Sequence, residues 1–166
     1  MKVVKLENRI RVGVLIFEDN KILLVKHVDP VTGFTWWVPP GGGLKGTETI
    51  FECGEREVKE ETNLNVKLDK IAYIRQLIFH QQKANNIEIF MTSLSHKGRM
   101  SIKGIVGKGE DENYIKQVKF FSKKDLKNIK VFPSEIKEEM WEDYKKGFPS
   151  IKFLGVEDDS EHGIME

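Results

Sequence analysis

A glycine-rich turn followed closely by a well-capped helix constrains the fold of this chain more than any other feature of its sequence. Residues 39–43 read Pro-Pro-Gly-Gly-Gly, a run that is not expected to form regular structure. Thr49 and Glu52 have the spacing of a capping box, so a helix is predicted to begin there and to continue to Thr62. Asn63 can adopt the left-handed conformation that ends a helix. The segment therefore predicts a tight bend that leads into one rigid helix.

Three glutamates of this predicted helix share one face, because residues three and four apart are neighbours on a helix. They are Glu57, Glu60 and Glu61. Like charges at this spacing repel one another, and a divalent cation removes the conflict. Mg²⁺ prefers oxygen ligands and bridges readily to phosphate oxygens, so this face is a candidate magnesium site. Taken alone, with Lys59 beside it, the same pattern is also typical of a solvated helix face.

The longer pattern around these glutamates is much more specific. Gly42 is followed after five residues by Glu48, and after seven more residues by Arg-Glu-Val-Lys-Glu-Glu-Thr-Asn-Leu at 56–64. This pattern resembles the Nudix box of the Nudix (MutT-like) hydrolase family. It departs from the box at Asn63, where the family has glycine, and Asn tolerates the left-handed geometry better than other side chains. The resemblance implies a Nudix fold over residues 5–147.

The resemblance also implies a role for each matching residue. Glu48 and Arg56 are expected to pair and to hold the loop against the helix. Glu57 is expected to be either a metal ligand or the base that activates water. The base of this family can also come from a later loop, where residues 110–112 are acidic. The resulting prediction has Glu57, Arg56 and Glu112 as catalytic residues, and Gly41 (through its carbonyl), Glu57, Glu60 and Glu61 as metal ligands.

The reaction implied by the resemblance is Mg²⁺-dependent hydrolysis of a pyrophosphate bond by attack of water at phosphorus, with Mn²⁺ as a possible replacement. The expected substrate is a small nucleotide-like molecule in which a nucleoside diphosphate is linked to a further group. Motifs typical of the ADP-ribose, NADH and coenzyme A subgroups are missing, which favours a nucleoside triphosphate. The alternative is a Nudix-fold module that senses a nucleotide without cutting it. Such modules tend to lose box glutamates, and all four are present here.

Two tryptophans precede the glycine turn. Trp36 and Trp37 are predicted to bind substrate, because a nucleobase can stack on an indole ring; the alternative for each is core or loop packing. Cys53 lies among acidic residues of the predicted helix, which argues against a reactive thiolate.

The rest of the chain predicts strands that alternate with helices. Residues 9–17 and 21–27 are expected to form a hairpin, and residues 134–146 a helix capped by Ser134. The predicted class is α+β, an α/β/α sandwich with a mixed β-sheet packed between helices. Residues 1–156 are expected to form a single domain, and residues 157–166 a polar, frayed tail.

The charge balance limits the possible partners. Lys plus Arg number 27 and Asp plus Glu 26, which gives a net charge of +1 and no general attraction to nucleic acid or to an anionic membrane. An anionic substrate must then be held by a local site. The single cysteine and the lack of a long apolar run favour a protein of the cytoplasm. No membrane association and no stable nucleic-acid partner are expected, whereas a homodimer is compatible with the sequence.

Overall fold

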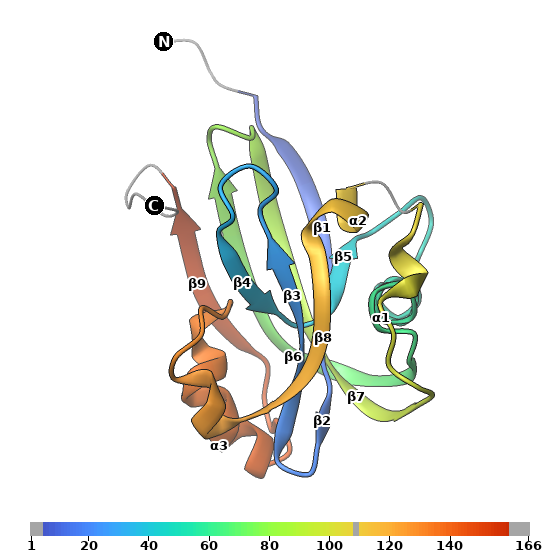
Figure 1. The fold of residues 1–166 in the computed structure, drawn as a ribbon. Helices are drawn as coiled ribbons and strands as arrows, with labels where there is room; N and C mark the ends of the chain where they lie inside the picture. Colours follow the sequence, from blue (N-terminus) through green and yellow to red (C-terminus); the bar gives the residue numbers. More distant parts are fainter. Residues whose placement is uncertain (1–4, 108–109, 160–166) are drawn as a thin grey trace.

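The structure, a computed structural model, describes residues 5–107 and 110–159, and the strands of this part form two sheets (Figure 1). The larger sheet has five strands in the order β5-β1-β7-β6-β9. It is mixed, because β1 runs parallel to β7 and β6 runs parallel to β9, while the other pairs are antiparallel. Its strands are β1 (Glu7–Leu15), β5 (Gly41–Gly43), β6 (Asn65–Phe79), β7 (Ala84–Lys97) and β9 (Lys152–Asp158).

The smaller sheet is antiparallel and is centred on β3, which pairs with β2, β4 and β8. Its hairpin turns at Asp19 and Asn20, whose φ angles of 48° and 56° suit a tight two-residue turn. The hairpin predicted for residues 9–17 and 21–27 is therefore only partly correct: β2 pairs with β3, whereas β1 belongs to the other sheet. The strands are β2 (Phe17–Glu18), β3 (Lys21–Val28), β4 (Thr35–Val38) and β8 (Ile115–Ser122).

The longer helices α1 (Ile50–Thr62) and α3 (Glu139–Lys145) each pack against strands of both sheets. Helix α1 has the predicted boundaries, with a capping box between Thr49 and Glu52 and a left-handed Asn63 at its end. The predicted helix 134–146 is broken, because Ser134 begins a 3₁₀ turn rather than capping a continuous helix. The remaining helical segments are η1 (Lys103–Ile105), α2 (Glu110–Tyr114), η2 (Lys123–Leu126) and η3 (Ser134–Lys137).

The core has two main layers. One contains Val58 and Cys53 of α1 packed against apolar residues of β1, β6 and β7. The other contains Met140 and Trp141 of α3 packed with Trp37 and Tyr73 of the strands. Sheets packed between helices confirm the predicted α+β sandwich, although the strands divide into two sheets where one mixed sheet was expected.

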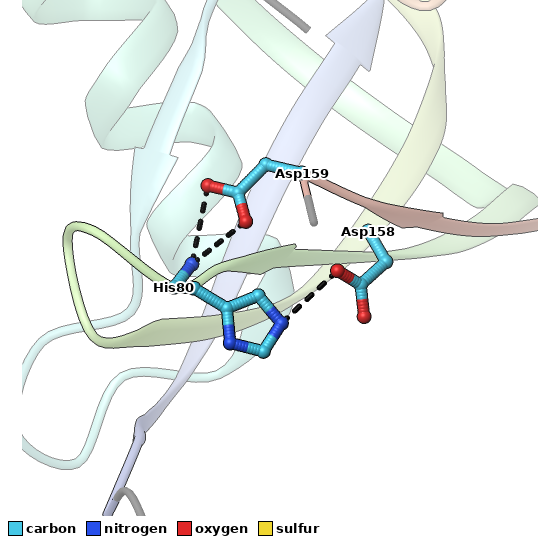
Figure 2. A group of neighbouring side chains, drawn as sticks. All are labelled: His80, Asp158 and Asp159. Carbon is cyan, nitrogen blue, oxygen red and sulfur yellow. Dashed lines mark hydrogen bonds and ion pairs between the residues drawn. The ribbon is translucent and has the colours of Figure 1, made fainter. Parts of the chain in front are cut away.

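Strand β9 corrects the expected C-terminal boundary. Glu157 and Asp158 belong to this strand and pair in register with β6, so the polar tail does not begin at residue 157. Residues 160–166 lie outside the described residues. The end of β9 is tied to the turn after β6 (Figure 2): His80 Nε2 lies 3.0 Å from an Asp158 oxygen, and the His80 backbone N–H donates to the Asp159 carboxylate. In the described segments, no helix has the length and apolar character required to cross a bilayer.

Candidate active site

Helix α1 is fixed at both ends and along its inner face. Thr49 Oγ1 accepts the backbone N–H of Glu52, and the Glu52 carboxylate accepts the N–H of Thr49 at 2.8 Å. At the other end, Lys59 Nζ donates to the carbonyl and side chain of Asn63. A side chain at Gly54 would meet Leu68 and other apolar side chains, so glycine lets the helix pack closely on the larger sheet. The helix is therefore a rigid support for its polar residues.

Arg56 is the hub of the polar residues on α1. It pairs with Glu48 through Nε and also through Nη2, at 3.0 Å from the second carboxylate oxygen. Its Nη2 also donates to the Gly43 carbonyl at 3.1 Å, and its Nη1 lies 2.6 Å from Glu57 Oε1. These bonds tie the loop that follows β5 to the helix. The guanidinium lowers the pKa of Glu48 to about 2, chiefly by donating hydrogen bonds to its charged form.

The glycine turn approaches the helix carboxylates directly. Glu57 and Glu61 are only 4% and 1% exposed, which is unusual for glutamate. The Gly41 N–H donates to Glu61 Oε2 at 3.0 Å. A side chain at Gly42 would collide with the carboxyl group of Glu57. Residues 39–43 were expected to be irregular, but the absence of side chains lets Gly41–Gly43 form strand β5 against β1.

The donor set of this face fits a divalent cation. Arg56 lies within hydrogen-bond distance of Glu48, Glu57 and Glu60, the last at 3.5 Å, and one guanidinium charge does not neutralise three carboxylates. Glu61 adds a further carboxylate, so that the helix face has three, from Glu57, Glu60 and Glu61. Burial of this much like charge is unfavourable without further compensation, and clustered carboxylate oxygens are the ligands that Mg²⁺ prefers.

A second cluster of potential metal-binding side chains has its donor atoms close to one another. Among the described residues, the His80, Asp158 and Asp159 cluster has donor atoms that all lie within 4.8 Å of one another (Figure 2). The helix carboxylates are instead held by Arg56 and by the Gly41 N–H. Ligation by the helix face would therefore compete with hydrogen bonds inside the protein, whereas the His80 cluster is partly exposed and joins the ends of β6 and β9.

The two tryptophans have different positions. Trp36 stacks on His27 and Phe34, with ring centroids 5.3 and 5.6 Å apart, and it lines a pocket. Trp37 is 7% exposed and packs edge-on against Phe121 in the core. Alternate residues of a strand point to opposite faces, so only one of two adjacent tryptophans can face the pocket. The structure therefore corrects the expectation that Trp37 binds substrate.

The acidic segment before β8 is only partly described. Glu112 Oε2 accepts the backbone N–H of Gly107 at 3.0 Å, so this carboxylate is directed toward its own loop. The side chains of Glu110 and Asp111 lie outside the described residues. Earlier in the same connection, the Ser101 N–H donates to the Thr62 carbonyl, and Ile105 is buried. This part of the segment therefore packs against the end of α1.

A pocket of about 380 Å³ opens beside the glycine turn. Gly41 and Gly42 line it, so it adjoins the carboxylate face of α1. Its other walls come from both sheets and include three arginines. Sequence reasoning did not find the pocket, because its residues are widely separated along the chain: Arg9, Arg11 and Arg75, with Asn86, Glu88, Glu157, His27, Trp36, Phe79 and Phe132 among them.

Cys53 lies on the inner face of α1 and is buried. Its Sγ lies 3.7 Å from the Gly42 carbonyl oxygen. Burial raises the pKa of this thiol to about 11, with the neighbouring glutamates adding to the effect. The thiol is therefore protonated at neutral pH and has a structural role.

Comparison with known proteins places these features in context. The chain matches the NUDIX domain family model over residues 7–142. It is 40% identical over 62 residues to the m7GpppN-mRNA hydrolase NUDT17 of Danio rerio. That match covers 36% of this chain and 21% of the relative, so the chain spans only about a fifth of the relative's length.

Solved structures share the fold. A MutT Nudix hydrolase from Burkholderia pseudomallei superposes with a TM-score of 0.64 at 19% identity, over 80% of this chain and 97% of that one. A MutT protein from Methanosarcina mazei Go1 gives a TM-score of 0.64 at 19% identity, over 88% of this chain and 99% of that one. At this identity the likeness establishes the architecture alone.

Proposed function

Because the chain belongs to the NUDIX domain family, we propose that it is a Mg²⁺-dependent hydrolase that cleaves a pyrophosphate bond in a nucleotide-like substrate. A nucleoside triphosphate is the favoured substrate. The observation that carries the proposal is the position of Glu57 and Glu61. Both are buried on one helix face, and both contact the glycine turn that lines the pocket.

The helix face is assigned to hold the metal. Glu57, Glu60 and Glu61 provide carboxylate oxygens, and the Gly41 carbonyl is the predicted backbone ligand. A divalent ion in such a site polarises phosphate oxygens and compensates the charge that develops on them. Mn²⁺ has similar ligand preferences and is expected to substitute for Mg²⁺.

The protein's own residues position and deprotonate the attacking water. In the proposed reaction the water oxygen bonds to phosphorus, the bond from phosphorus to the bridging oxygen breaks, and the water proton passes to a carboxylate. Glu57 is the first candidate base, because Arg56 holds one of its oxygens at 2.6 Å and fixes its orientation. Glu112 is the second candidate, and it would have to leave the Gly107 N–H to take this role.

The pocket supports an anionic, partly aromatic substrate. Arg9, Arg11 and Arg75 outnumber Glu88 and Glu157 on its walls, and Trp36 offers an aromatic surface. These features suit a nucleotide. The identity with an mRNA cap hydrolase makes a cap dinucleotide of the m7GpppN type a second candidate substrate.

The proposal is tested with a substrate panel. The purified chain is incubated with the common and oxidised nucleoside triphosphates, sugar-linked nucleoside diphosphates and a cap dinucleotide, each with Mg²⁺, Mn²⁺ or EDTA. Product release that depends on the metal is the expected result. Tight nucleotide binding with no product from any member of the panel would instead indicate a sensing module.

A further inference from the structure

The pocket lies between the two sheets and has walls from both. Strands β1, β6 and β7 of the larger sheet provide Arg11, Arg75 and Asn86, whereas β3 and β4 of the smaller sheet provide His27 and Trp36. A ligand that enters it from the glycine turn would therefore contact both sheets.

The charged groups of the larger sheet are satisfied by one another. Arg75 is buried and lies 2.6 Å from Glu88 and 3.2 Å from Glu157. Arg11 lies 3.5 Å from the other oxygen of Glu88. Charges thus alternate across β1, β7, β6 and β9, which makes this part of the wall rigid. A side chain that recognises a ligand by hydrogen bonding must have a donor or acceptor that is not already used inside the protein. These paired charged residues do not provide one.

Asn86 provides such an acceptor. Its side chain is 8% exposed and lines the pocket, yet its Oδ1 has no hydrogen-bond partner among the described residues. Burial of an amide oxygen without a donor is unfavourable, so buried amides are normally paired. The neighbouring Asn85 shows the normal case on the opposite face of β7, since its Oδ1 accepts from Gln76 and its Nδ2 donates to Asn8.

The opposite wall has a second atom of this kind. His27 Nδ1 is buried without a partner in the described residues, and the ring stacks on Trp36. Burial lowers the pKa of His27 to about 4, so the ring is neutral at pH 7. The two sheets thus each present one unsatisfied polar atom in the same pocket, beside an aromatic surface. Two polar atoms that lack partners, next to an aromatic ring, suit a planar heterocycle that can both hydrogen bond and stack.

We infer that the pocket takes the nucleobase of the substrate and that Asn86 determines specificity by hydrogen bonding to the edge of that base. The inference rests on the proposed function and deepens it. A side-chain amide has one donor and one acceptor group side by side, so it matches a base edge on which a donor adjoins an acceptor. The Arg75 network holds the neighbouring wall in place and does not itself read the base.

The experiment compares Asn86→Leu and Asn86→Asp with the wild type. Asn85→Leu is the matched control, because it changes the same residue type at the next position of the same strand, on the opposite face. Binding of the four nucleoside monophosphates is followed by tryptophan fluorescence in EDTA, and hydrolysis of the four triphosphates and of inorganic triphosphate is measured with Mg²⁺. Thermal unfolding checks that each variant is folded.

Asn86→Leu is expected to weaken nucleoside monophosphate binding by about ten- to a hundredfold, while Asn85→Leu has little effect. Asn86→Asp has two acceptors and is expected to shift preference toward guanine, whose edge offers two adjacent donors, by about tenfold. If Asn86→Leu fails to fold, the change in base preference of Asn86→Asp is the test of the inference. Inorganic triphosphate, which has no base, is expected to be hydrolysed equally by all variants.

The two proposals fail in different ways. If nucleotides are hydrolysed, but both Asn86 variants bind and discriminate bases as the wild type does, the base-reading role of Asn86 is wrong and the hydrolase proposal stands. If binding depends on Asn86 but no product forms under any condition, the hydrolase proposal is wrong. An equal loss in Asn85→Leu would also reject the inference, because the effect would then belong to the strand rather than to the pocket.

Discussion

The carboxylate face of α1 and the neighbouring pocket meet at Gly41 and Gly42, yet they are assembled over very different lengths of chain. Arg56 pairs with Glu48 eight residues away, and Glu61 with Gly41 twenty residues away. In the pocket, Arg75 pairs with Glu88 and Glu157, at separations of 13 and 82 residues. One region is encoded locally, whereas the other exists only after the two sheets have formed.

The two regions are expected to have different functions. The local region holds groups that suit the chemistry of a diphosphate, which is shared by many nucleotides. The long-range region holds groups that can distinguish one nucleotide from another. Substitutions in the local region are therefore expected to change turnover for every substrate, and substitutions in the pocket to change selectivity.

The largest effect is expected for Glu57→Gln. Loss of its charge removes a predicted metal ligand or base, and turnover is expected to fall at least about a hundredfold while the fold survives. Steady-state kinetics with Mg²⁺ and circular dichroism measure the two properties. Glu55→Gln is the control, because Glu55 is an exposed glutamate of the same helix. Near-wild-type turnover in Glu57→Gln would break the assignment of chemistry to this face.

A smaller effect is expected for Gly42→Ala. The added methyl would collide with the Glu57 carboxyl, so either the turn or the carboxylate must move. We expect turnover to fall by about tenfold or more and stability to fall by about 1–3 kcal/mol. Gly43→Ala is the matched control, since a methyl there meets no atom within 4 Å of the described structure. Equal effects of the two substitutions on turnover and denaturation midpoint would show that close approach to Glu57 is unimportant.

Tyr73→Phe tests a contact between residues far apart in the sequence that lies away from the pocket. The Tyr73 hydroxyl donates to the buried Asp143 at 2.5 Å, across 70 residues of sequence. Its loss is expected to cost about 1–2 kcal/mol of stability and to leave kcat within about twofold. Urea unfolding and kinetics check this, with Tyr144→Phe as the control, because Tyr144 stacks on Phe17 through its ring. A large loss of activity in Tyr73→Phe would contradict the separation of the two regions.

The smallest effect is one of pH. The pKa of Glu48 is about 2 in the folded chain and near 4.5 when unpaired, because Arg56 stabilises its charged form. The stabilisation is therefore complete above about pH 4.5 and is lost as the pH falls toward 2. Glu48→Gln is expected to unfold at a lower temperature than the wild type at pH 7, with the difference shrinking between pH 4.5 and 2. A difference in melting temperature that stays constant over this range would reject the ion pair as its cause.

The same contrast explains what could be read from the sequence. The limits of α1, its caps and its row of carboxylates follow from residues a few positions apart, and the structure has them as predicted. Strand β9 was missed, because its apolar run is short and forms a strand only through its pairing with β6. The segment 134–146 forms a 3₁₀ turn followed by a short helix, since Ile136 and Met140 are fixed by core packing rather than by helix periodicity alone.

The site itself divides in the same way. Spacing alone was enough to place Glu57, Glu60 and Glu61 on one face. It could not separate Trp36 from Trp37, because which of two adjacent residues faces inward depends on the register of β4 against β3. Asn86 carried no signal in the sequence. Its importance depends on the missing hydrogen bond at Oδ1, which is visible only in three dimensions.

The most direct test of the account is the binding of Mn²⁺, followed by the loss of the free-ion signal in electron paramagnetic resonance. Two clusters compete for the assignment, the helix glutamates and the His80 group. The account predicts that Glu57→Gln and Glu61→Gln each weaken Mn²⁺ binding at least about tenfold, while His80→Ala binds as the wild type does. Unchanged binding in both glutamate variants, with loss of binding in His80→Ala, would contradict it.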